Sequence, residues 1–210
     1  MMRCYIYMAS NVALLVIDMQ KAIDQPFWAR FGPRNNPEAE QNIARLLDAW
    51  RRAGMPVFHV RHDSKEPQST YRPGQEGHMF KPEALPLAGE PVIGKQTGNA
   101  FVGTGLEAAL REAGITRLAI AGVITNNSVE STVRMAGDLG FEAHLAEDAC
   151  FTFAFPDWQG RTRSAEEVHA MSLANLHGEY CTVLKTEEVL SLLTVGPAAP
   201  EFGIDRGEAI

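Results

Sequence analysis

The sequence predicts an α/β protein, a three-layer α/β/α sandwich with a mostly parallel six-stranded sheet. Short apolar runs alternate along the chain with segments of helical periodicity, which is typical of strand–helix–strand units. Continuous apolar runs, such as NVALLVI at residues 11–17, are typical of strands buried on both faces. Because crossovers between parallel strands are right-handed, the helices are expected on both faces of the sheet.

The elements follow one another in a regular order. Strands are expected at residues 11–17, 56–60, 90–93, 118–123, 141–146 and 181–185. Helices are expected at residues 37–54, 104–114, 129–139 and 164–176, with a short one from residue 186. Asn35 or Asn36 is a candidate cap for the first helix. Capping boxes are expected at residues 104–107 and 164–167.

Length and composition limit the organisation and the partners. The 210 residues suit a single domain, expected at residues 9–195 with tails at 1–8 and 196–210. A net charge of −7 argues against nucleic acid or an anionic membrane as partner. No apolar run approaches the roughly 20 residues that span a bilayer, and the N-terminus lacks a secretory pattern. Three scattered cysteines form neither a disulfide framework nor a zinc cluster, so a cytoplasmic location is expected.

Residues 61–91 are the exception to this compact pattern. The stretch holds five prolines and three glycines and has no clear periodicity. Loops of this length inside a compact domain are usually functional. We therefore expect residues 61–91 to cover a substrate pocket.

Candidate chemistry is expected just after each strand, because open parallel sheets bind ligands beyond the carboxyl ends of their strands. Asp18 follows a fully apolar run and is either a carboxylate positioned for function or the cap of the next turn. Lys95 is either a site residue or a solvated surface lysine. Ser128 lies where a strand turns into a helix, which suits a nucleophile or oxyanion hole as well as a plain helix cap.

Two phosphate-binding motifs and a metal site are not supported by the spacing. Gly89 and Gly94-Lys95 have P-loop spacing, but Gln96 stands where a Ser or Thr is needed. The first strand is not followed by the glycine-rich turn of dinucleotide-binding folds. The group at residues 59, 62 and 63 offers three candidate ligands, too few for a metal site. We expect no metal and no cofactor.

Three separated segments together resemble the isochorismatase-like hydrolase superfamily: LLVIDMQ (14–20), GKQTGNAFVGTGL (94–106) and AGVITNNSVESTVRMAGDLGFEAHLAEDA (121–149). The likeness runs from about residue 11 to residue 193 and implies the Rossmann-like fold of that family. It also implies a homodimer or larger homo-oligomer. The family's Asp–Lys–Cys triad would fall on Asp18, Lys95 and the position of Ser128. A cis peptide at Val123–Ile124, just before Thr125, would direct backbone N–H groups to the substrate oxygen.

Ser128 departs from the family pattern at the centre of the mechanism, because a hydroxyl is a far weaker acid than a thiol of pKa ~8.5. The serine is either an engineered substitution or the natural residue of a distinct branch. The turn at residues 126–128, which reads as a coherent helix cap, favours a natural serine. A branch of the family binds a metal through an Asp-x-His pair and a distant His, and residues 58–63 do not match that pattern.

The resemblance and the strand-end residues together predict a metal-free hydrolase of a small amide, ureido or related C–N compound. Asp18 would act as general acid and base, Lys95 as electrostatic stabiliser and Ser128 as the nucleophile. Phe27, Trp28 and the 61–91 loop would shape the pocket. Two alternatives stay open: vinyl-ether hydrolysis by Asp18 and Lys95 without a nucleophile, and a catalytically silent small-molecule-binding protein. Vinyl-ether hydrolysis would need basic residues for two carboxylates, for which only Arg61 and Arg72 are candidates.

Overall fold

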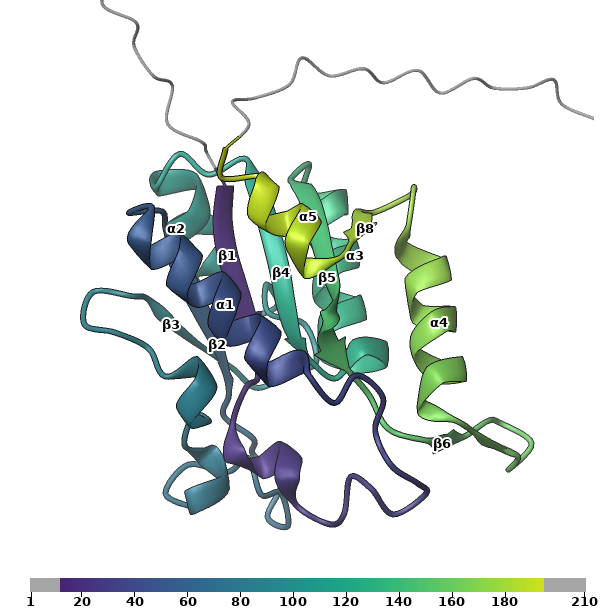
Figure 1. The fold of residues 1–210 in the computed structure, drawn as a ribbon. Helices are drawn as coiled ribbons and strands as arrows, with labels where there is room; N and C mark the ends of the chain where they lie inside the picture. Colours follow the sequence, from purple (N-terminus) through teal and green to yellow (C-terminus); the bar gives the residue numbers. More distant parts are fainter. Residues whose placement is uncertain (1–11, 195–210) are drawn as a thin grey trace, which may run out of the picture.

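The computed structural model describes residues 12–194, which contain a six-stranded sheet with strand order β3-β2-β1-β4-β5-β8 (Figure 1). Every pairing between neighbouring strands is parallel, so the predicted fold class is confirmed. The strands are β1 (Val12–Ile17), β2 (Val57–His62), β3 (Val92–Lys95), β4 (Arg117–Val123), β5 (Glu142–Phe151) and β8 (Thr182–Leu184). The expected tails, residues 1–8 and 196–210, lie outside the described residues.

Helices cover both faces of the sheet (Figure 1). Helices α1 and α5 pack against one face, and α2, α3 and α4 pack against the other. Their bounds are α1 (Ala39–Arg52), α2 (Leu106–Glu112), α3 (Glu130–Asp138), α4 (Ala165–Leu176) and α5 (Thr186–Ser191). A small hairpin, β6 (Phe155–Pro156) with β7 (Thr162–Arg163), precedes α4. Among the described residues, no helix is long and apolar enough to cross a membrane.

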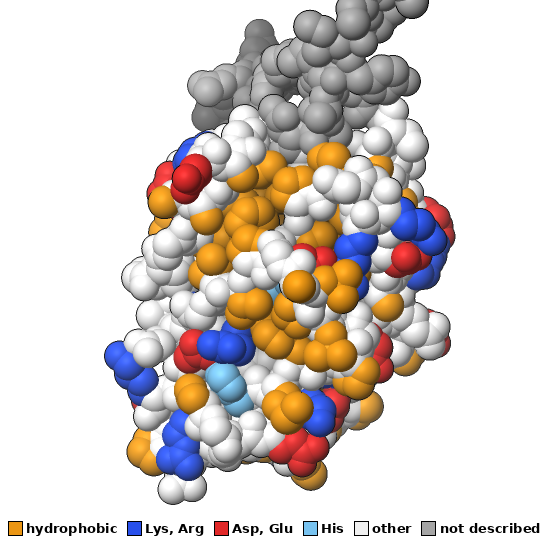
Figure 2. Space-filling view, turned by 90° about the vertical axis from the view of Figure 1, so that its left-hand side faces the viewer, with side chains coloured by type: hydrophobic (Ala, Val, Ile, Leu, Met, Phe, Trp, Pro, Cys, Tyr) orange, Lys and Arg blue, Asp and Glu red, His pale blue; other side chains and the backbone are white. Residues whose placement is uncertain are grey.

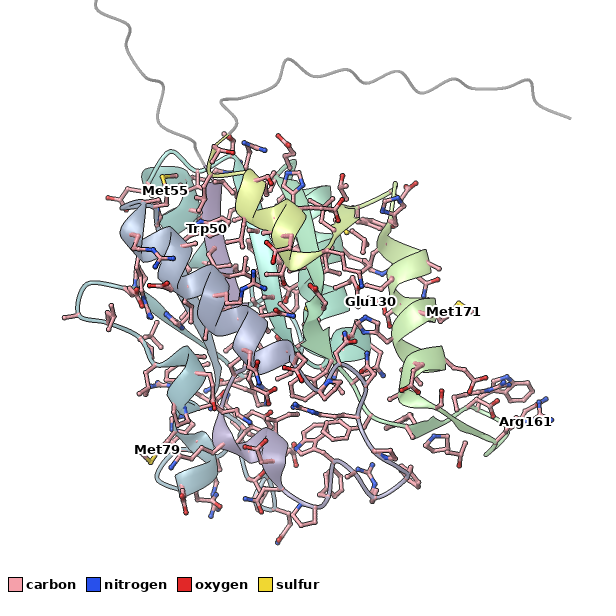
Figure 3. All side chains as sticks on the ribbon, viewed as in Figure 1. Trp50, Met55, Met79, Glu130, Arg161 and Met171 are labelled. Carbon is pink, nitrogen blue, oxygen red and sulfur yellow. The ribbon has the colours of Figure 1, made fainter. Side chains whose placement is uncertain are left out.

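Strand β1 lies at the centre of the two hydrophobic cores. Its residues alternate between them: Leu14 and Val16 face α1 and α5, whereas Leu15 and Ile17 face α2 and α3. Trp50 of α1 is fully buried against this sheet and donates its Nε1–H to the Val12 carbonyl at 3.3 Å (Figure 3). The apolar stripe expected on the first helix is therefore the face that packs on the sheet.

The cap expected at Asn35 or Asn36 is not formed, since α1 begins at Ala39 without a side-chain cap. The Asn36 amide instead donates to the carbonyls of Glu147 and Cys150, at 2.8 and 2.7 Å. Asn35 Oδ1 accepts from the Thr152 backbone N–H at 2.8 Å. These contacts fasten the segment before α1 to the end of β5, and buried backbone groups there outcompete the helix terminus for the two amides.

One of the two expected capping boxes is present. In α4, the Ser164 Oγ accepts from the Glu167 N–H at 3.2 Å, and Glu167 Oε2 accepts from the Ser164 N–H at 2.8 Å. The box expected at residues 104–107 is absent. Thr104 donates its hydroxyl to the Ala100 carbonyl at 2.6 Å, and α2 begins at Leu106 after Gly105.

The segment expected to be an irregular loop, residues 61–91, begins at the carboxyl end of the sheet and returns beside the β3 edge to the start of β3. Its start belongs to β2, and its remainder contains short 3₁₀ turns at Glu76–His78 and Pro82–Ala84. Gln20 fastens it, because the Gln20 amide donates to the carbonyls of His62 and His78 at 3.1 and 2.9 Å. Gln20 also pairs with Phe80 in an isolated bridge. The segment is therefore held over the strand ends.

Figure 2 shows the face beside the edge strand β3, where hydrophobic side chains gather on the surface. Three apolar residues of this edge and the loop before it, Leu85, Leu87 and Val92, have relative exposures of 52%, 54% and 39%. The charged groups nearby are partly paired. Arg51 of α1 donates to both carboxylate oxygens of Glu90 at 2.7 and 2.9 Å, which anchors the loop before β3.

Candidate active site

The three predicted catalytic residues meet at the carboxyl end of the sheet. Asp18 directly follows β1, Lys95 is the last residue of β3, and Ser128 lies in the π-helical segment Thr125–Val129 after β4. These strand ends lie on the lower side of the sheet in Figure 1. Three residues separated by up to 110 positions in sequence are brought together because all their strands run in the same direction.

Lys95 is the centre of the cluster. Its ammonium Nζ lies 2.7 Å from Asp18 Oδ2, 3.2 Å from Ser128 Oγ and 3.1 Å from the Thr97 carbonyl oxygen. The Lys95 side chain is 0% exposed and that of Asp18 is 6% exposed. The interpretation of Lys95 as a solvated surface lysine is therefore wrong. In a buried pair of this kind each charge offsets part of the desolvation cost of the other, because either charge alone would be costly to bury.

Asp18 is held in an unusual backbone conformation, with φ of 52°. Burial raises the pKa of its carboxyl, and the neighbouring Lys95 ammonium opposes that rise. Its Oδ1 is buried and has no hydrogen-bond partner among the described residues. Asp18 therefore does not cap the following turn. It keeps one acceptor free at the centre of the cluster, on a carboxyl that binds a proton more readily than an exposed aspartate.

Ser128 is 8% exposed, and neither its segment nor α3 has a side-chain cap, so the alternative of a plain helix cap is wrong. The peptide bond between Val123 and Ile124 is cis, as the resemblance implies. The Ile124 carbonyl accepts the N–H groups of Asn127 and Val129 at 3.1 and 3.3 Å. These bonds fix the turn that brings the serine hydroxyl to Lys95.

A cavity of about 520 Å³ opens above the cluster. Asp18 and Ser128 lie in its wall, and so do the predicted pocket residues Phe27, Trp28, Val123 and Ile124. Thr125 does not line it, because its side chain is buried and its hydroxyl contacts His169 Nδ1 at 2.9 Å. The segment expected to cover the pocket contributes His62, Ser64, Glu66, Gln68, Ser69, Thr70 and Tyr71.

His62 lies beside the cluster, although its sequence context suggested only a possible metal ligand. Its Nδ1 lies 3.3 Å from Lys95 Nζ, and its ring packs edge-on against Tyr71 at 5.6 Å. Burial, and then the Lys95 charge, lower the pKa of the imidazole, which favours its neutral form. The sequence shows that His62 lies just after a predicted strand, but its place opposite Lys95 depends on the register of β2 and β3.

The other candidate ligands and nucleophiles are engaged elsewhere. His59 contacts Glu90 at 2.8 Å, and Asp63 is held by Arg61 and His78. Residues 12–194 contain no group of three or more His, Cys, Asp or Glu side chains arranged to hold a metal ion. Burial raises the pKa of the Cys181 thiol to about 12 and raises that of Cys150 further. Cys4 lies outside the described residues.

Comparison with known families gives a match over almost the whole described chain. The model of the isochorismatase domain matches residues 12–188. The chain belongs to the isochorismatase family. This membership makes it an isochorismatase-family hydrolase with the α/β fold of that family.

Several relatives of this isochorismatase-family hydrolase support the assignment. A crystal structure of an isochorismatase-family protein from Chromobacterium violaceum is 61% identical, covers 90% of this chain and 96% of its own, and superposes with a TM-score of 0.85. The uncharacterised isochorismatase family protein YrdC of Bacillus subtilis is 38% identical over 88% of this chain and 97% of its own length. Nicotinamidase 3 of Arabidopsis thaliana is 30% identical over 78% of this chain and 79% of its own.

Proposed function

We propose that this protein hydrolyses a small amide or ureido C–N bond with Asp18, Lys95 and Ser128 as its catalytic residues. The observation that carries the proposal is the position of one buried ammonium, which contacts a carboxylate at 2.7 Å and a hydroxyl at 3.2 Å beside a cavity. Acyl transfer uses a nucleophile, a proton acceptor and a group that stabilises the oxyanion, for which a buried ammonium is suited.

Ser128 would supply the nucleophile. Because Lys95 donates to Ser128 Oγ, the hydroxyl proton remains available to Asp18, whose Oδ1 has no other partner among the described residues. Asp18 takes that proton while Oγ bonds to the substrate carbonyl carbon. The C=O electron pair moves to oxygen. Because Ser128 Oγ uses its lone pair in the new bond, the Lys95 N–H that contacted it is free to stabilise the resulting negative charge.

Asp18 would then return the proton to the leaving nitrogen, so that the C–N bond breaks and ammonia or an amine departs. A water molecule next gives a proton to Asp18 and attacks the ester carbonyl carbon. The ester bond to Ser128 breaks, its oxygen recovers the proton, and a carboxylic acid is released. Burial of Asp18 assists both halves, because a raised pKa makes the carboxylate a better base.

Two features support an amide over the vinyl-ether alternative. A relative bears the name nicotinamidase, which describes the hydrolysis of an amide. Isochorismate has two carboxylates, and within residues 12–194 no Lys or Arg side chain lines the cavity to bind them. Arg61, one candidate for that task, is paired with Asp63 at 2.8 Å.

The test is ammonia release from a panel of small primary amides and ureido compounds. The wild-type protein is expected to release ammonia, Ser128→Ala to lose the activity, and Asp18→Asn to lose about 10²–10⁴-fold. Ser191→Ala, an exposed serine of α5, is the matched control and should match the wild type. Failure of both the wild type and Ser128→Cys on every amide would contradict the proposal and favour a binding protein.

The proposal includes self-association into a homodimer or larger homo-oligomer. Exposed apolar side chains on two surfaces support it. One is the β3 edge of Figure 2, and the other surrounds the β6–β7 hairpin, where Trp158 is 91% exposed. Met171 of α4 is also exposed and points away from the body of the protein (Figure 3). Light scattering coupled to size exclusion measures the mass, and a monomer at all concentrations would contradict self-association.

A further inference from the structure

We propose that the cavity selects planar neutral or cationic ligands, with an amide or amidine group at Asp18, and rejects carboxylates. This inference rests on the proposed function for the position of the reacting group. It concerns binding, however, and can be measured without turnover. Four features of the cavity carry the inference: the charges of its wall, the occupied N–H donors of Lys95, two unpartnered polar atoms and the aromatic side chains.

The charged side chains in the cavity wall are acidic. Asp18 lies at its floor and Glu66 in the segment that covers it, and in the described part of the chain no Lys or Arg side chain is among the lining residues. Glu66 is exposed, and its carboxylate makes no ion pair or hydrogen bond within residues 12–194. His62 is held toward its neutral form. Lys95 compensates the Asp18 charge, so an entering anion meets the unpaired carboxylate of Glu66, whereas an entering cation can pair with it.

Lys95, the nearest cation, has no donor left for a ligand carboxylate. An ammonium carries three N–H donors. Four acceptors already lie within 3.3 Å of Nζ: Asp18 Oδ2, the Thr97 carbonyl, Ser128 Oγ and His62 Nδ1. A carboxylate would have to displace one of these contacts, which would leave that acceptor unpaired in a buried place.

Two buried polar atoms of the lining residues have no hydrogen-bond partner among the described residues. One is the acceptor Asp18 Oδ1, and the other is the donor Trp28 Nε1. A primary amide offers an N–H donor for the first and a carbonyl acceptor for the second, while an amidinium offers donors for Asp18. A carboxylate can accept from Trp28 Nε1 but offers no donor to Asp18 Oδ1, so it would leave that buried acceptor unpaired or opposed by an oxygen.

The aromatic side chains of the wall favour a flat ligand. Trp28 packs edge-on against Phe27 at 5.7 Å and against Tyr71 at 6.0 Å, with interplanar angles of 82° and 86°. Arg30 already lies over the Phe27 ring at 3.7 Å, Phe153 stacks on Trp28 at 6.3 Å and His62 packs edge-on against Tyr71 at 5.6 Å. A ligand therefore meets the remaining faces of Trp28 and Tyr71. Such rings bind planar groups through dispersion and bind cations through their π faces.

The experiment uses three ligands of nearly identical shape and different charge: benzamide (neutral), benzamidine (cationic) and benzoate (anionic). Their dissociation constants are measured by calorimetry at pH 7 on the full chain carrying Ser128→Ala, which prevents turnover. Benzamide and benzamidine are expected to bind at least about 10-fold more tightly than benzoate, the ratio that one unpaired buried group produces. Benzoate binding as tightly as benzamide would overturn the inference, and so would absence of binding by all three.

Glu66→Gln tests the charge argument separately from the shape of the cavity. The variant should weaken benzamidine binding about 2- to 5-fold, as expected for a solvent-exposed charge pair, and leave benzamide binding unchanged. Glu83→Gln is the matched control, because Glu83 is an exposed carboxylate that does not line the cavity. Equal effects of the two variants on benzamidine would contradict a role for Glu66.

The outcomes separate this inference from the proposed function. If the affinity order holds and no amide is hydrolysed by the wild type or by Ser128→Cys, the proposed function fails and the selectivity stands. If ammonia is released and benzoate binds as tightly as benzamide, the selectivity fails and the proposed function stands. If both the proposed function and the selectivity hold, the cavity also binds weakly the carboxylate product that amide hydrolysis generates.

Discussion

Replacing Lys95 with methionine tests the buried charge pair in isolation, because methionine fills a similar volume without the charge. Lys95 and Asp18 are 0% and 6% exposed, and their charged atoms lie 2.7 Å apart. Removing one member of such a pair costs about 3–5 kcal/mol of unfolding free energy. Asp18 can partly relieve the cost by taking up a proton, since burial raises its pKa. We therefore expect a loss of about 3 kcal/mol at pH 7, the low end of that range.

The assay is urea unfolding at 25 °C, with Lys21→Met as the matched control. Lys21 pairs with Glu76 at 3.1 Å, but these side chains are 34% and 80% exposed, so its loss should cost less than about 1 kcal/mol. The cost of Lys95→Met relative to the wild type should shrink as the pH falls, because folding then favours protonated Asp18. Equal costs for the two lysine variants would refute the account of a buried pair.

Three further predictions concern other parts of the molecule. Ser128→Cys should raise the rate of amide hydrolysis by ~10²-fold, which corresponds to about 3 kcal/mol of activation barrier. The new thiol should also react with iodoacetamide faster than the thiols of the parent protein. An unreactive thiol in a folded variant would contradict the assignment of residue 128 to the nucleophile position. The Arg51 guanidinium helps hold the pKa of Glu90 at about 2. The ionised Glu90 carboxylate therefore contributes its full stabilisation of the fold above pH 4.5, and this contribution is lost as the pH falls toward 2. The urea midpoint of Glu90→Gln should accordingly approach that of the wild type as the pH falls from 4.5 to 2. A difference between the two midpoints that stays constant with pH would contradict this prediction. Gly122→Ala should reduce the urea midpoint far more than Gly103→Ala. A Cβ at Gly122 would lie 2.2 Å from the Ile17 backbone oxygen, whereas a Cβ at Gly103 would meet nothing within 4 Å, so equal midpoints would contradict that close approach.

Much of the fold could be predicted because continuous apolar runs mark the buried parallel strands that organise it. The run at residues 12–17 is apolar at every position, and the structure buries every one of its residues on one face or the other of the sheet. A site at the carboxyl edge then follows from parallel topology alone, which brought Asp18, Lys95 and Ser128 to one place. Their assignment as a group depended on the family resemblance, since each residue by itself also had a plain structural interpretation.

The remaining features depend on contacts between segments distant in sequence. Asn36 has the residue type of a helix cap, but it bonds to carbonyls at the end of β5, more than 100 residues away. The course of residues 61–91 has no periodicity to reveal it and depends on Gln20, which is fastened beneath it. His62 was a histidine of unknown purpose until the register of β2 and β3 placed it opposite Lys95. Local patterns carry no information about such pairings.

The most direct test of the central claim is to map the covalent intermediate on Ser128. The wild-type protein is mixed with benzamide, quenched in acid during turnover, digested and examined by mass spectrometry. The account predicts a benzoyl ester on the peptide that contains Ser128, and its absence in Ser128→Ala and Lys95→Met. Steady ammonia release by Ser128→Ala at the wild-type rate, with no benzoylated peptide in the wild type, would contradict a serine nucleophile.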